Sequence, residues 1–168
     1  MEDSTEQDLV ENDVLKNVCQ LKHFSIKFVK ESSSNCYFLV EALELAIPMR
    51  FYKKTMESVK VALYNAMVVA EKHKTTLNLM SEDEVLLEEL VEDKENDYQL
   101  RMTTSIYNRS LAIWLRTFYN SPDTGGWVHT KRAIKFSPTQ TEFELFNNFV
   151  NTRYTPKPKT VYKKMKKV

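Results

Sequence analysis

Glycine is nearly absent from this chain of 168 residues, which contains just the adjacent pair Gly125 and Gly126. This scarcity excludes the P-loop and the dinucleotide-binding fingerprint, because both phosphate-binding loops need several glycines at fixed spacing. Glycine also supplies the positive-φ turns that compact β-sheet folds use repeatedly. We therefore predict a chain built mainly from helices.

Cysteines are few, and long apolar runs are missing. Cys19 and Cys36 are too few for a disulfide framework and fit reduced thiols. No stretch reaches the roughly 18 apolar residues of a membrane-spanning helix, and the acidic start of the chain lacks the apolar segment of a secretory signal. These absences predict an intracellular protein without membrane insertion, in the cytoplasm, with the nucleus as an open alternative.

Opposite charges are strongly segregated along the sequence. Residues 1–13 carry six acidic side chains and no basic ones, and residues 82–97 carry nine acidic side chains beside the single Lys94. From Arg153 to the end there are seven basic side chains and no acidic ones. This pattern indicates a sticky end and not a uniformly basic surface. We expect an acidic extension (1–5), one helical domain (6–154) and a lysine-rich flexible tail (155–168).

The clearest periodic segment spans residues 49–73. Its apolar side chains recur at helical spacing, whereas its lysines lie off that arc. The apolar set is Tyr52, Met56, Val59, Leu63, Ala66, Met67 and Ala70. This spacing predicts an amphipathic helix with a basic outer face.

Other segments also favour helices. Ser81 and Glu84 form a capping box, and Ser137 with Gln140 repeats that start signal. We expect helices over residues 6–22, 36–47, 49–73, 82–97, 98–119 and 137–154. The predicted fold class is therefore all-α, a compact bundle of five or six helices. The sequence also allows a minor two-stranded β pairing between residues 24–28 and 132–136.

Residues with catalytic or metal-binding chemistry are not arranged in a recognised motif. Cys19 and His23 have a spacing that can place two ligands on one helix face, but a buried thiol beside a surface imidazole explains them better. Glu84, Glu88 and Glu92 would align on a helix, where a solvated acidic face is the simpler interpretation. We therefore predict no catalytic residue, no metal, no cofactor and no enzymatic activity.

The C-terminal tail is the main candidate for binding. Two prolines favour an extended backbone there, and the basic cluster resembles short import signals and nucleic-acid patches. The candidate residues of the tail are Lys157, Lys159, Tyr162, Lys163, Lys164, Lys166 and Lys167. A solubilising tail without a partner is an equally good interpretation. Trp127, which follows the glycine pair, is a candidate protein contact, although a core-capping role explains it as well.

Two functions follow from these features. The first is a non-enzymatic helical adaptor or regulatory protein that acts through protein contacts, with the tail as a nuclear-import or docking arm. The alternative is a nucleic-acid-associated protein that binds phosphates without sequence preference through the tail and through Lys53, Lys54 and Lys60 on the basic helix face. The low alanine content is typical of AT-rich genomes, such as those of viruses. The partner protein and the oligomeric state stay open.

Overall fold

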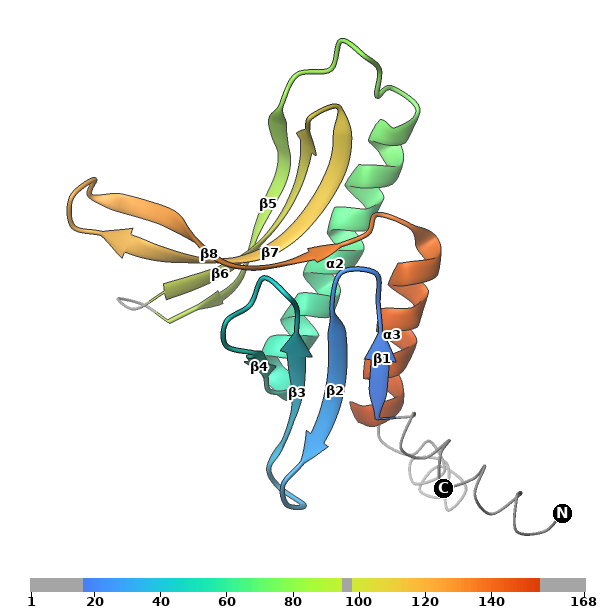
Figure 1. Cartoon of the computed structure of the whole chain (residues 1–168), viewed down its shortest axis with the longest axis vertical. Helices are drawn as coiled ribbons and strands as arrows, with labels where there is room; N and C mark the ends of the chain where they lie inside the picture. The colour runs from blue at the N-terminus through green and yellow to red at the C-terminus, as the bar shows by residue number, and fades with distance from the viewer. Residues whose placement is uncertain (1–16, 95–97, 155–168) are drawn as a thin grey trace, which may run out of the picture.

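The chain folds into two antiparallel four-stranded sheets, each followed along the sequence by a helix (Figure 1). The computed structural model describes residues 17–94 and 98–154. Sheet A and the helix after it comprise β1 (Val18–Gln20), β2 (Ser25–Lys30), β3 (Cys36–Glu41), β4 (Met49–Phe51) and α2 (Lys53–Lys74). Sheet B and its helix comprise β5 (Glu84–Asp93), β6 (Tyr98–Tyr107), β7 (Ser110–Ser121), β8 (Gly126–Phe136) and α3 (Gln140–Tyr154).

The predicted all-α bundle of five or six helices is wrong, and the turns explain why scarce glycine was misleading. The hairpin between β6 and β7 is closed by Asn108 and Arg109, both with positive φ, of 52° and 63°. Asparagine tolerates this left-handed conformation better than most residues. Only one hairpin uses glycine in this way, at Gly125 between β7 and β8. Polar residues therefore make turns that we had assigned to glycine.

The helices predicted over residues 82–97 and 98–119 are strands β5, β6 and β7. In β5, register irregularities between Val85 and Leu87 and between Leu90 and Glu92 interrupt the alternation of faces. A bulge of this kind inserts one residue into the period-2 pattern, so the apolar spacing resembles that of a helix. Ser81 accordingly caps no helix; its hydroxyl accepts a hydrogen bond from the Asn78 amide in the preceding turn.

Two further helix predictions also fail, and the β pairing that we allowed between residues 24–28 and 132–136 is wrong, although both segments contain strands. Residues 36–41 of the predicted helix 36–47 form β3, and β1 occupies residues 18–20 of the predicted helix 6–22, whose first residues lie outside the described part. Both segments of the allowed pairing are strands. However, β2 pairs with β1 and β3 in sheet A, whereas β8 pairs with β7 in sheet B.

The amphipathic helix predicted over residues 49–73 is confirmed from Lys53 onward as α2, whereas Met49–Phe51 form β4. The side chains from Met56 to Ala70 that we assigned to its apolar arc are buried, but Tyr52 precedes the helix and is exposed. The last predicted helix is α3, which begins at Gln140, and the hydroxyl of Thr139, not that of Ser137, accepts the Glu142 amide at 3.4 Å. Among the described residues, neither helix is long and apolar enough to cross a membrane.

Each helix packs against the sheet of the other half. The helix α2 contacts β5 and β6 of sheet B, and the Thr104 hydroxyl donates to the Ala66 carbonyl at 3.2 Å. The helix α3 contacts β1 of sheet A, with the Phe38 and Phe149 rings 6.0 Å apart. One hydrophobic cluster joins both sheets and both helices. The helix α2 therefore covers one face of sheet B (Figure 1).

Candidate functional site

The face of sheet B opposite α2 carries a cluster of aromatic and basic side chains. Strand residues alternate between the two faces, and directly paired residues on neighbouring strands share a face. The buried Met102 and Leu115 pair on the face toward α2, so Thr103 and Trp114 face away. We call this surface the outer face of sheet B; it includes Glu88, Gln99, Arg101, Trp114, Arg116, Phe118, Trp127, His129 and Lys135.

Cations on this face lie over aromatic rings. The Arg101 guanidinium carbon is 4.3 Å from the Phe118 ring centroid and 6.0 Å from that of Trp127. The guanidinium of Arg116 and the Lys135 ammonium lie 4.9 Å and 5.7 Å from the Trp114 ring centroid. Each contact falls within the range of a cation–π interaction. The outer face therefore presents positive charge and flat rings side by side.

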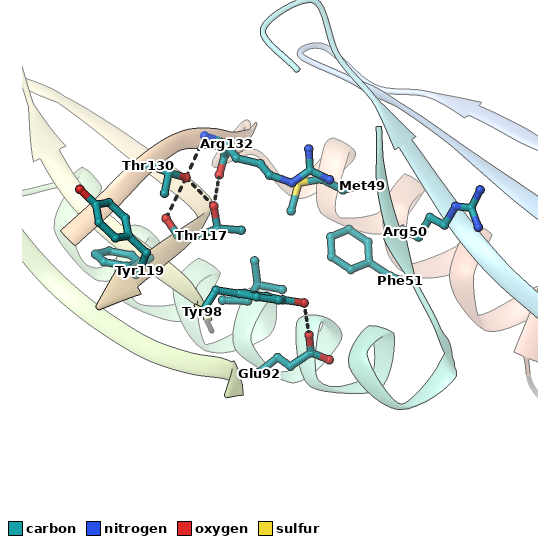
Figure 2. A pocket seen from close by; sticks show the side chains of 11 residues that line it. Met49, Arg50, Phe51, Glu92, Tyr98, Thr117, Tyr119, Thr130 and Arg132 are labelled. Carbon is teal, nitrogen blue, oxygen red and sulfur yellow. Dashed lines mark hydrogen bonds between the residues drawn. The ribbon is translucent and has the colours of Figure 1, made fainter. Parts of the chain in front are cut away.

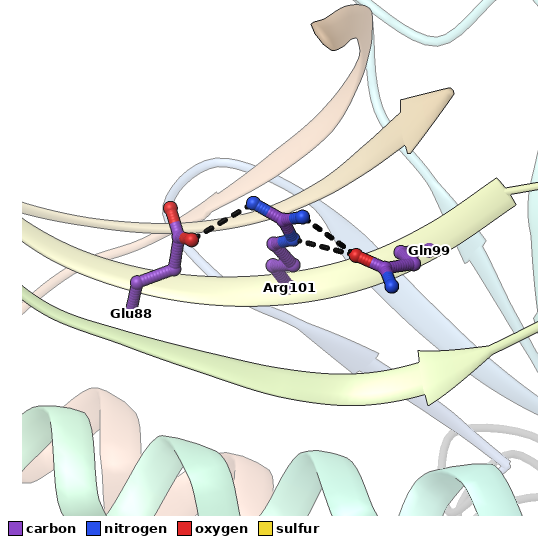
Figure 3. Close-up of polar contacts among 3 residues, drawn as sticks. All are labelled: Glu88, Gln99 and Arg101. Atoms are coloured by element: carbon purple, nitrogen blue, oxygen red, sulfur yellow. Dashed lines mark hydrogen bonds and ion pairs between the residues drawn. The ribbon is translucent and has the colours of Figure 1, made fainter. Parts of the chain in front are cut away.

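Hydrogen bonds hold Arg101 in place across the sheet (Figure 3). One terminal nitrogen donates to the Glu88 carboxylate at 2.8 Å, and two other nitrogens donate to the Gln99 side-chain oxygen at 2.9 Å and 2.6 Å. A guanidinium fixed in this way loses little further entropy when it meets a ligand. The Glu88 carboxylate neutralises part of the positive charge of Arg101.

Arg116 lies in a different electrostatic setting. One terminal nitrogen of Arg116 lies 3.2 Å from Nδ1 of His129. Within the described residues, Arg116 forms no ion pair with a carboxylate. Burial lowers the pKa of Arg116, but an arginine keeps its proton at neutral pH. The outer face therefore holds a half-buried cation whose charge no acidic side chain of this region neutralises.

A cavity of about 370 Å³ lies where the two sheets meet, on the side of sheet B opposite the outer face (Figure 2). We call it the junction pocket; β4 supplies Phe51, and sheet B supplies Glu92, Tyr98, Leu100, Tyr119 and Arg132. Its polar edge is organised by Thr117 and Thr130, whose hydroxyls bond to each other and to neighbouring backbone groups. The pocket thus combines aromatic walls with fixed polar groups.

The lysines that we predicted on the 49–73 helix have different surroundings in the structure. Lys53 is exposed at the start of α2, whereas Lys60 bonds to the Asn151 side chain of α3. Lys54 lines a shallow hollow together with Glu57 and Glu89. The role of these three lysines in binding is still a prediction.

The other predicted binding residues are placed as follows. Trp127 is half-buried in β8, on the outer face and beside Arg101. The tail residues lie outside the described part of the chain: Lys157, Lys159, Tyr162, Lys163, Lys164, Lys166 and Lys167.

The acidic and thiol candidates are distributed over several elements. Glu88 faces the outer side of sheet B, whereas Glu92 lies in the junction pocket, where Tyr98 donates to it at 2.9 Å. Cys19 and Cys36 are free thiols in sheet A, and burial raises the pKa of Cys19. Within residues 17–94 and 98–154, no three metal-ligating side chains gather at one place.

Sequence reasoning missed the residues at the centre of the outer face. Trp114, Arg116 and Phe118 stand at every second position of "WLRTF". This alternation is a period-2 signal, and it was hidden because both faces of β7 carry large apolar side chains. A search for aromatic and basic residues two positions apart would have found it.

The chain matches no protein-family model, no curated protein and no solved structure. Function must therefore be inferred from the residues of the sites themselves.

Proposed function

We propose that this protein binds single-stranded nucleic acid on the outer face of sheet B. The observation that supports the proposal is the placement of Arg101 over Phe118 and of Arg116 over Trp114 on an uncovered sheet. Bases of a single strand stack on aromatic side chains, while neighbouring cations attract the phosphates. A sheet with exposed aromatic residues is an established platform for this mode of recognition.

Single strands fit this face better than duplex DNA. The bases of a duplex are stacked on each other and offer no free ring to Trp114 or Phe118, and reading their edges usually needs a helix or a two-stranded ribbon in the major groove. Stacking on these rings depends little on which base is present, because every base has a π-face. Binding with little sequence preference is the expected result.

The basic tail fits the same function. Its six lysines, between Lys157 and Lys167, would add phosphate contacts without base readout. In this proposal the protein is a non-enzymatic binding protein that acts inside the cell, in the cytoplasm or the nucleus. Protein contacts through Trp127 and the tail, which the sequence had favoured, would use some of the same residues and are separated from nucleic-acid binding by the experiment below.

The test is fluorescence anisotropy with a labelled oligonucleotide of about 12 nucleotides, a length within the range that one such binding surface covers. We expect binding to single-stranded DNA or RNA, weaker binding to a duplex, and a loss of affinity as salt rises from about 0.05 to 0.2 M. The doubly substituted variant Arg101→Gln/Arg116→Gln should weaken binding by about tenfold or more, since charged hydrogen bonds and ion contacts each contribute over 1 kcal/mol.

The matched control is Lys72→Gln/Lys74→Gln, which removes the same charge from the exposed end of α2. This control should bind nearly as well as the unmodified chain. Equal losses in both variants would mean that net charge, and not the outer face, determines binding. Failure of the unmodified chain to bind any single strand would refute the proposal and favour protein contacts.

A further inference from the structure

The junction pocket has a size and a lining that suit a small flat molecule. Its volume of about 370 Å³ lies within the range of roughly 300–1,000 Å³ that is typical of ligand pockets. Phe51 and Leu100 form buried apolar walls, while Tyr98 and Tyr119 are directly paired across β6 and β7. Aromatic walls of this kind favour a planar ring that can stack on them.

One side of the pocket offers unused hydrogen-bond donors. The Arg132 guanidinium donates to the Ile47 carbonyl at 2.6 Å and to the Pro48 carbonyl at 2.9 Å. A guanidinium has five N–H groups, so three are left after these two bonds. Among the described residues, Arg132 forms no ion pair with a carboxylate. A partly buried arginine of this kind suits an anionic group such as a phosphate.

The opposite side of the pocket offers an acceptor. Figure 2 shows Glu92 below the Tyr98 ring, across the pocket from Arg132. The Glu92 carboxylate accepts hydrogen bonds from the Tyr98 hydroxyl at 2.9 Å and from the hydroxyl of Thr55. An ionised carboxylate has about four acceptor sites. It can therefore accept further N–H groups from the edge of a ring.

We infer that the junction pocket binds a mononucleotide, with the base between the aromatic walls, its N–H edge on Glu92 and its phosphate on Arg132. Guanine fits best, because its N1–H and N2–H₂ groups lie side by side and can both donate to one carboxylate. This site lies across sheet B from the outer face. It goes beyond the proposed function, because its ligand is a free nucleotide and not a strand.

The experiment is calorimetric titration of the full chain with guanosine monophosphate, compared with the adenosine, cytidine and uridine monophosphates. We expect guanosine monophosphate to bind most tightly. Guanosine, which lacks the phosphate, should bind about tenfold more weakly, the change expected for a charged hydrogen bond. A Kd for guanosine monophosphate weaker than about 1 mM would overturn the inference, since this Kd corresponds to a binding free energy of only about −4 kcal/mol.

Two variants locate the bound nucleotide. Glu92→Gln keeps the shape of the side chain but removes its charge, and should weaken binding of guanosine monophosphate by about tenfold. Tyr119→Ala removes a wall at a position that is 43% exposed, so the chain should still fold, and should weaken binding of all four nucleotides. If Glu92→Gln lowered the thermal stability, Tyr119→Ala would decide; unchanged affinity in Tyr119→Ala would overturn the inference.

Trp114→Ala is the control, because it alters the outer face and leaves the pocket intact. It should leave the Kd for guanosine monophosphate unchanged. A chain that binds oligonucleotides but not mononucleotides would overturn this inference alone, whereas the reverse result would overturn the proposed function alone.

Discussion

Trp114→Ala is the most informative substitution on the outer face. The Trp114 ring lies 4.9 Å from the Arg116 guanidinium carbon and 5.7 Å from the Lys135 ammonium, as measured to its centroid. Removing one stacking ring costs about 1–3 kcal/mol of binding free energy, which corresponds to a Kd about 5- to 150-fold higher. The substitution also removes the ring that positions the Arg116 and Lys135 side chains, which should weaken binding further.

The assay is fluorescence anisotropy with a labelled single strand, together with a thermal melt of each variant to confirm folding. Tyr64→Ala is the matched control, since Tyr64 is an aromatic residue that is 58% exposed and belongs to α2, which packs on the opposite face of sheet B. Its Kd should change less than about twofold, within the range of a neutral surface substitution. A folded Trp114→Ala variant with unchanged Kd would refute the stacking argument.

Three further predictions concern stability. Leu63 of α2 is 1% exposed, and Leu63→Ala should lower the free energy of unfolding by about 2–5 kcal/mol. Val61→Ala, at a 59% exposed position, should lower it far less. Equal shifts of the two variants in urea melts would show that we have assigned the wrong face of α2 to the core. Thr139→Ala should cost about 0.5–2 kcal/mol through loss of the α3 cap, and a neutral result would mean that its 3.4 Å contact with the Glu142 amide contributes nothing. Burial and two nearby lysines lower the pKa of His23, so the unfolded chain binds that proton more readily. The stability present above about pH 6.5 should fall as the pH drops further, and His23→Gln should remove that part of the fall in melts recorded across this range; an identical pH profile would contradict the assignment.

The two helices were predictable because they satisfy one periodicity each. Residues Met56 to Ala70 of α2 follow a single arc and are buried together. In the sheets the same reasoning failed, since side chains on both faces of β7 are large and apolar and the bulges of β5 shift its alternation. Tertiary packing decides such segments, because a short apolar run fits either a strand or a buried helix. The turn at Asn108 shows in addition that hairpins form without glycine.

The candidate site was harder to predict than the helices. Arg101, Trp114 and Trp127 come from three strands that share one face only after the sheet has formed. Sequence reasoning therefore singled out Trp127 by its residue type, but it could not pair it with Arg101. The lysines of the tail were visible because they are contiguous, whereas a surface assembled across strands has no contiguous signal.

The most direct test of the proposed function is intrinsic tryptophan fluorescence. The chain contains two tryptophans, and both Trp114 and Trp127 lie on the outer face of sheet B. Titration with unlabelled oligothymidylate should quench their emission to a saturating level, because thymine bases that stack on the rings are in direct contact with them. The account predicts that this quenching follows the same binding curve as anisotropy and weakens with added salt. Binding seen by anisotropy without any change in tryptophan emission would contradict it, since the strand would then lie elsewhere on the protein.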